Sequence, residues 1–138
     1  MQTYFGEYLI SDDKALVQID RVCELLSDTY WAHSRTKETT QTVIDNSFCF
    51  GVYKDGVQVA FARCITDYGA IYYLADVVVD KDYRGKGLGK ALIRFITEHE
   101  LFATKYGVLD TRDAHGLYER FGFVRTEPGR YMVRRRSR

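Results

Sequence analysis

The sequence is poor in the residues that cross-link secreted domains and bind metals. It contains three cysteines, one proline and three histidines among 138 residues. Cys23, Cys49 and Cys64 are odd in number, widely spaced and surrounded by apolar residues, so we predict buried free thiols instead of a disulfide framework or a cysteine-rich zinc site. His33 and His99 have no acidic or cysteine neighbours at ligand spacing, and the sequence therefore predicts no metal.

Long apolar runs and a large net charge are also missing. No segment approaches the roughly 20 apolar residues that a membrane-spanning helix needs. Met1–Phe5 has neither the basic region nor the apolar stretch of a signal peptide, so we expect a cytoplasmic protein. The formal net charge of +1 gives no general attraction to nucleic acid. The local exception is Arg134–Arg138; such an end is usually solvated, and binding to RNA or an acidic partner is the alternative.

The pattern of apolar residues predicts one mixed α+β domain over residues 1–138, a length that suits a single well-buried core. Alternating and helical spacings predict strands at 4–10, 48–53, 57–66, 71–79, 107–110, 123–126 and 131–134, and helices at 15–26, 36–46, 87–102 and 114–121. The run 71–79 is almost wholly apolar and is predicted to be a central strand. Asp55 and Gly56 predict a hairpin turn, and Pro128 falls in the turn between the last two strands.

A glycine-rich basic loop follows the strand that ends at Val79. The loop, Arg84–Lys90, alternates glycine with larger residues and opens a helix. Glycines let the backbone approach an anion, and the first turn of a helix offers unpaired N–H groups. The segment therefore predicts a pyrophosphate site. Its spacing fits neither the Gly-x-Gly-x-x-Gly of a dinucleotide-binding turn nor a Walker loop, because Ala91 follows Lys90.

Two motifs of the chain, in this order, resemble those of the GNAT superfamily of N-acetyltransferases. Arg84, Gly87 and Gly89 match its acetyl-CoA-binding motif, and Leu117–Phe123 matches a second motif, LYE-x-FGF. The resemblance covers roughly Phe48–Val133. It implies a central twisted mixed sheet of about seven strands flanked by about four helices, which splays open between the strands at 71–79 and 107–110.

The resemblance also implies acetyl-CoA as a cosubstrate, with no metal. Its pantetheine arm would pair with the backbone of the strand at 71–79, and Thr111 stands where the family often has an asparagine. The implied acetyl-CoA-binding residues are Val77, Val78, Val79, Arg84, Gly85, Lys86, Gly87, Leu88, Gly89, Lys90 and Thr111.

Two side chains are candidates for catalysis. Tyr118, at the tyrosine of the second motif, is predicted to protonate the departing thiolate as a general acid, and packing beneath the helix is the alternative. Asp76 lies in an otherwise apolar strand, where burial is expected to raise its pKa and make it a general base. A structural ion pair, binding of the substrate amine as an anion, or a water-relayed base are the alternatives for Asp76.

The acceptor pocket is expected between the first two helices and the later loops. Trp31 is predicted to form an aromatic wall and Arg35 to pair with a substrate carboxylate, with a core-capping tryptophan and a solvated arginine as the alternative. Tyr72 and Tyr73 point to opposite faces of their strand, and we expect Tyr73 to reach the cleft.

These residues together predict an enzyme that transfers an acetyl group from acetyl-CoA to a primary amine of a small molecule. The cysteines lie outside both motifs, which favours direct attack in a ternary complex over an acetyl-cysteine intermediate. Two alternatives stay open: a CoA-binding regulatory module without turnover, and an acetyltransferase for a protein or RNA-associated substrate. The resemblance also suggests a homodimer through the last strands.

Overall fold

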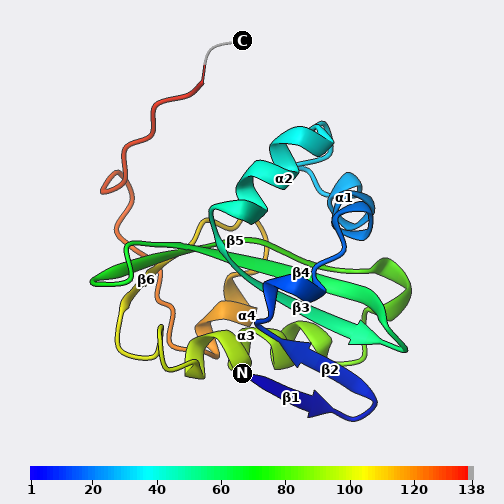
Figure 1. Cartoon of the computed structure of the whole chain (residues 1–138). Helices are drawn as coiled ribbons and strands as arrows, with labels where there is room; N and C mark the ends of the chain where they lie inside the picture. Colours follow the sequence, from blue (N-terminus) through cyan, green and yellow to red (C-terminus); the bar gives the residue numbers. More distant parts are fainter. Residues whose placement is uncertain (137–138) are drawn as a thin grey trace.

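The computed structural model describes residues 1–136, folded as a mixed α+β structure (Figure 1). Its elements are, in chain order, β1 (Gln2–Phe5), β2 (Tyr8–Ser11), a 3₁₀ turn η1 (Lys14–Leu16), α1 (Ile19–Ser27), α2 (Lys37–Asp45), β3 (Phe48–Lys54), β4 (Val57–Thr66), β5 (Ile71–Val79), a second 3₁₀ turn η2 (Lys81–Tyr83), α3 (Leu88–Glu98), β6 (Tyr106–Val108) and α4 (His115–Glu119).

The strands form one sheet in the order β1-β2-β3-β4-β5-β6. All neighbours are antiparallel except β5 and β6, which pair in parallel only through Ile71–Tyr73 and Tyr106–Val108. Beyond Tyr73, the edge of β5 that faces β6 has no strand partner among the described residues. The sheet therefore splays open between these two strands, as the sequence predicted.

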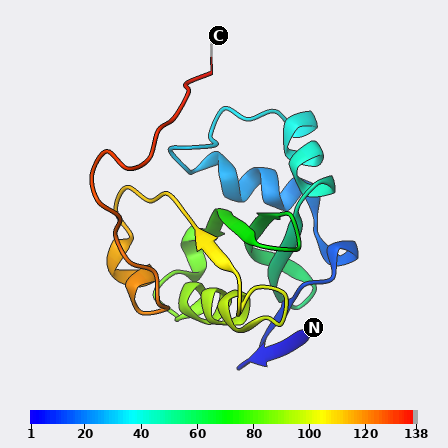
Figure 2. The ribbon, with the colours of Figure 1, turned by 90° about the vertical axis from the view of Figure 1, so that its left-hand side faces the viewer.

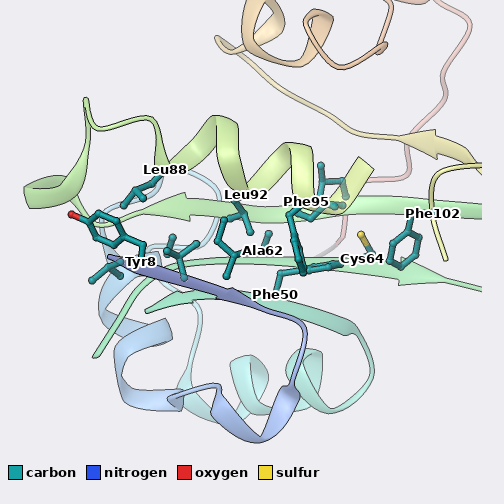
Figure 3. Packing of buried hydrophobic residues seen from close by; sticks show 14 of the residues in the cluster. Tyr8, Phe50, Ala62, Cys64, Leu88, Leu92, Phe95 and Phe102 are labelled. Atoms are coloured by element: carbon teal, nitrogen blue, oxygen red, sulfur yellow. The ribbon is translucent and has the colours of Figure 1, made fainter. Parts of the chain in front are cut away.

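Helices cover both faces of the sheet. Helices α1 and α2 lie on one face, and α3 and α4 lie on the other (Figures 1 and 2). The larger buried cluster fills the space between the sheet and α3, where Phe50, Phe102 and Leu92 meet (Figure 3). A smaller cluster around Phe61 and Leu26 packs under α1. The sheet, including β5, is therefore packed on both of its faces by apolar side chains.

Local sequence signals account for most element boundaries. The Thr36 hydroxyl accepts a hydrogen bond from the Thr39 amide and begins α2, where the sequence predicted a helix. Asp55 and Gly56 both adopt positive φ angles, 50° and 78°, as the tight turn between β3 and β4 requires. Both predictions are confirmed.

Two predictions about the ends of the chain are wrong. The single strand predicted at 4–10 is the hairpin β1–β2, because Gly6 turns the chain with a φ of 59°. The strands predicted at 123–126 and 131–134 are absent, so the described residues contain six strands instead of about seven. Pro128 does lie in a turn, closed by a hydrogen bond from Arg130 N–H to the Glu127 carbonyl oxygen.

The remaining boundary differences are small. The first helix begins at Ile19, after η1, and α3 ends at Glu98 instead of about Phe102. In the C-terminal segment, Val124 is 83% exposed and Met132 92% exposed, so neither residue packs on the sheet. Over its described residues, the segment pairs with no strand of the sheet, so its backbone groups are left to water and it stays irregular.

Replacing Gly107 with alanine is expected to lower stability, because a Cβ at this position would lie 2.5 Å from the Cζ atom of the buried Tyr72. Overpacking of this kind costs about 1–3 kcal/mol. The measurement is a thermal melt. Gly116→Ala is the matched control, since a Cβ at Gly116 meets nothing within 4 Å. Equal melting temperatures for the two variants would contradict the packing of Tyr72 on β6.

Candidate active site

The glycine-rich loop places positive charge and backbone amides beside the end of β5. Gly85 and Gly87 have φ angles of 80° and 84°, a conformation that other residues rarely adopt. Gly87 is the N-cap of α3 and has no side chain to cap it, and the first-turn amides of a helix have no acceptor within the helix. The Arg84 Nε donates a hydrogen bond to the Val79 carbonyl oxygen at 3.1 Å, which holds this guanidinium at the strand end.

Lys86 precedes that helix start in the sequence, Lys90 lies in its first turn, and both are exposed. Together with Arg84, they surround the start of α3 with three cations. An anion of the size of a pyrophosphate therefore meets full charges, backbone amides and the positive end of the helix dipole at one place.

Strand β5 contains a bulge that changes which face its side chains reach. Its pairing with β4 shifts between Phe61 and Arg63, opposite Asp76, which has a φ of 53°. Leu74 packs in the cluster under α3, whereas Val78 packs in the cluster under α1. Strict alternation would put both on one face, so the extra residue at Asp76 reverses the sidedness of the strand. Beyond the bulge, the half-buried Val77 and Val79 lie on the edge that β6 leaves open.

The carboxylate of Asp76 is buried and receives hydrogen bonds from three side chains. Arg63 Nε donates to Oδ2 at 2.7 Å. Arg35 donates from Nη1 to Oδ2 at 2.6 Å and from Nη2 to Oδ1 at 3.3 Å, and Trp31 Nε1 donates to Oδ1 at 2.9 Å. Arg63 also reaches Ser47. One carboxylate thus joins β4, β5 and the loop between α1 and α2.

This geometry corrects the expected pKa of Asp76. Burial acts to raise the pKa, but the hydrogen bonds and charges of Arg35 and Arg63 outweigh it, and the pKa of Asp76 lies below its ordinary value. A carboxylate in this state is a weak proton acceptor at neutral pH. Of the alternatives considered from the sequence, the structural ion pair is the one whose contacts are present.

Helix α4 presents Tyr118 to a cavity of about 1030 Å³ between β6 and the C-terminal segment. The ring of Tyr118 packs edge to face on Phe123, with centroids 5.9 Å apart. Burial, together with the nearby phenol of Tyr30, raises the pKa of Tyr118 to about 12, so it holds its proton at neutral pH. Thr111 lines the same cavity and accepts a hydrogen bond from the Ala114 amide at 3.0 Å.

Comparison with known proteins identifies this arrangement of loop, strand and helix. Residues 45–125, more than half of the chain, match the sequence model of the acetyltransferase (GNAT) domain. A GNAT-family structure from Xanthomonas campestris pv. campestris is 40% identical, covers 96% of this chain and 95% of that one, and superposes with a TM-score of 0.89. The chain belongs to the GNAT family of acetyltransferases.

Two further likenesses agree with the GNAT fold. A Staphylococcus aureus protein of unknown function is 22% identical over 94% of this chain and 99% of that one, with a TM-score of 0.78, which shows the shared fold. A curated Gibberella zeae relative, named for acetyltransferase activity, is 28% identical over 113 residues. The match covers 67% of this chain and 64% of the length of that relative.

The residues predicted to bind the acceptor differ in their surroundings. Trp31 is 40% exposed, and its indole N–H donates a hydrogen bond to the Asp76 carboxylate. Arg35, expected to meet a substrate carboxylate, directs its guanidinium to Asp76 instead. Tyr73 is 38% exposed and Tyr72 is buried, and both line the cavity beside β6.

Three residues beside this candidate site are not among the site residues that the sequence predicted. Arg63 is buried in β4 and completes the ion pairs of Asp76. Tyr30 lies against Trp31 at a centroid distance of 5.0 Å, and the Arg112 guanidinium stands 3.8 Å from the Tyr30 ring centroid. Arg63 stands within an apolar strand, and a buried cation needs an anionic partner, so its position was a sequence signal for an ion pair with a buried acidic residue.

Other chemistries find less support among the described residues. Cys49 and Cys64 are buried, and burial raises their thiol pKa values to about 11 and about 12, so neither is a thiolate at neutral pH. Cys23 is only half-buried, where the sequence predicted burial. Within residues 1–136, His, Cys, Asp and Glu side chains nowhere gather in groups of three suited to a metal ion. None of the helices in that range has the length and hydrophobicity that a bilayer crossing demands.

Proposed function

We propose that this GNAT domain is an N-acetyltransferase that uses acetyl-CoA as cosubstrate and acetylates a primary amine of a small molecule. The observation that carries the proposal is the open edge of β5 leading directly into the glycine loop and α3. In this proposal, Arg84–Lys90 bind the pyrophosphate, and the backbone of Val77–Val79 pairs with the extended pantetheine arm. The hydroxyl of Thr111 supplies a further hydrogen bond from across the splayed sheet.

The proposed reaction is direct attack in a ternary complex. The amine nitrogen forms a bond to the acetyl carbon while the bond from that carbon to sulfur breaks. Tyr118 donates its phenolic proton toward the departing sulfur, and the proton lost by the amine passes to water. With a pKa of about 12, Tyr118 is protonated at neutral pH and available as a donor, and the tyrosinate formed by the transfer regains a proton from water.

For Asp76 we propose a positioning role in place of proton transfer. Its carboxylate fixes the bulge of β5 next to Val77 and the loop that carries Trp31. A base that is already hydrogen-bonded by two guanidinium groups cannot take a proton without losing those bonds. The water-relayed route is therefore the one that we retain for the amine proton.

The size and surroundings of the cavity support the remaining parts of the proposal. A volume of about 1030 Å³ suits a small molecule better than a folded substrate.

We also propose that residues 1–138 act as one domain, in the cytoplasm, and that two copies associate. The apolar side chains exposed on the C-terminal segment favour association. The basic end proposed for RNA binding lies partly outside the described residues.

Acetyl-CoA binding is the first test. We expect calorimetry to give a micromolar dissociation constant for the intact protein, and the Arg84→Ala/Lys90→Ala variant to bind more than about tenfold more weakly, because it loses two charges on the pyrophosphate. Lys14→Ala is the matched control, since Lys14 hydrogen-bonds the Asp45 carbonyl oxygen and lies near Asp12, which contacts His99 at the opposite end of α3.

The two remaining outcomes separate the alternatives. Binding without thiol release across a panel of amines would favour the regulatory module. Absence of binding to the intact protein would overturn both the enzyme and the module.

A further inference from the structure

Two aromatic side chains form an exposed platform at the turn after α1. Tyr30 and Trp31 are 46% and 40% exposed. Their rings meet edge to face, with an interplanar angle of 84°. The platform is rigid for an exposed surface, because Trp31 Nε1 donates a hydrogen bond to the buried Asp76. Rings of this kind that remain open to solvent offer a negatively polarised face to a ligand.

A cation already occupies that face. The guanidinium carbon of Arg112 stands 3.8 Å from the Tyr30 ring centroid, well within the range of a cation–π contact. Arg112 comes from the loop between β6 and α4, directly after Thr111. The contact therefore spans from the α1–α2 loop to the loop that borders the cavity, and it shows that a planar cation fits on Tyr30.

The platform lies near the proposed acid, and the neighbouring arginines are engaged. Arg112, which lies on the Tyr30 ring, directly follows Thr111, and Thr111 lines the same cavity as Tyr118. Arg35 and Arg63 both direct their guanidinium groups to Asp76. An acceptor bound between Tyr118 and Tyr30 thus meets an aromatic face, whereas the arginine expected to bind its carboxylate is already paired.

Resting on the proposed function, we propose that Tyr30 and Trp31 bind a second cationic group of the acceptor, which takes the place of the Arg112 guanidinium. The acceptor class is then a diamine or an aminoalkyl guanidine. One amine, as the free base, attacks the acetyl carbon and loses its proton to water, while the other cation stays charged on the Tyr30 face. The cation bound on the platform keeps its proton, because a different amine of the same acceptor reacts.

Three acceptors of equal chain length test this assignment: 1,5-diaminopentane, pentylamine and 5-aminopentanoate. With acetyl-CoA saturating, we expect kcat/KM for the diamine to exceed that for pentylamine by about 3- to 30-fold, the range of a partly desolvated cation–π contact. The aminopentanoate is expected to be the poorest acceptor. Equal values for the diamine and pentylamine, or a preference for the carboxylate, would overturn the assignment.

Variants of the platform give a second, independent comparison. Tyr30→Leu is expected to bring the ratio of diamine to pentylamine to about 1, whereas Tyr30→Phe keeps the ring and the ratio. Arg112→Met removes the competing guanidinium and is expected to lower KM for the diamine. Tyr68→Leu, at another exposed tyrosine, is the matched control. A ratio that survives Tyr30→Leu would rule out this platform.

Failure of the proposed function is separated from failure of this assignment by direct binding. Calorimetry with CoA present measures the dissociation constants of the diamine and pentylamine without turnover. Thiol release absent for every amine, with the diamine still bound more tightly, would overturn the enzyme and keep the cation site. Equal dissociation constants would overturn the cation site, whatever the enzyme does.

Discussion

Asp76→Asn is expected to lower the free energy of unfolding by about 3–5 kcal/mol at pH 7, the range found when one partner of a buried ion pair is removed. The variant keeps the size of the side chain and, because asparagine tolerates positive φ, the backbone of the bulge. It removes the one charge that compensates Arg35 and Arg63. Denaturant unfolding gives the difference, and Glu7→Gln, at an exposed ion pair, is the control, with an expected loss of about 0–1 kcal/mol.

The pH dependence of that difference gives a sharper test. The pKa of Asp76 is lower in the folded protein than its ordinary value, so its contribution to stability is complete above the ordinary aspartate pKa, about 3.9. It is lost as the pH falls below that value and through the folded pKa. The stability gap between the wild type and Asp76→Asn is therefore expected to be constant between pH 5 and pH 7, and to shrink below about pH 4. A gap that does not depend on pH would mean that the charge of Asp76 contributes nothing.

Tyr118→Phe is expected to lower kcat by roughly 10²–10⁴, the usual contribution of general acid–base catalysis, while acetyl-CoA binding persists. The substitution removes the hydroxyl alone, and the packing on Phe123 stays. Steady-state thiol release measures kcat, and calorimetry measures binding. Tyr68→Phe, at an exposed tyrosine outside the cavity, serves as the control.

The pKa of Tyr118 sets the pH range in which the acid works. Since burial raises that pKa to about 12, the phenol remains protonated throughout the neutral and mildly alkaline range. No alkaline loss of kcat below about pH 11 is therefore expected from this group. A full-rate Tyr118→Phe variant would remove the hydroxyl from the mechanism and leave Tyr118 as a packing residue.

Features that depend on local sequence could be predicted. The glycine loop, the helix at 36–46 and the Asp55–Gly56 turn each follow from residues within a few positions of one another. The splay of the sheet followed from family resemblance and was confirmed by the short pairing of β5 with β6. These elements position Val77–Val79 and the start of α3, which is most of the proposed acetyl-CoA site.

Features that depend on distant residues could not be predicted. The bulge at Asp76 needs one extra residue opposite β4, and nothing in the run 71–79 marks it. The direction of the pKa shift of Asp76 depends on Arg63 in a different strand and on Arg35 in a loop. The C-terminal strands failed because strand formation depends on pairing with a distant segment, and residues 123–134 pair with neither the open edge of β5 nor that of β6.

The bulge at Asp76 also determines which residues evolution or a designer can place there. Its left-handed backbone favours glycine, asparagine and aspartate, while its two guanidinium partners require a negative charge. Glutamate supplies the negative charge but strains the backbone at this φ angle. Asparagine adopts the φ angle without strain but lacks the charge. A library randomised at this codon and selected for folding should therefore return aspartate almost alone. Other residues should become acceptable only when Arg35 and Arg63 are randomised with it, since a well-packed apolar set can replace a buried ionic one.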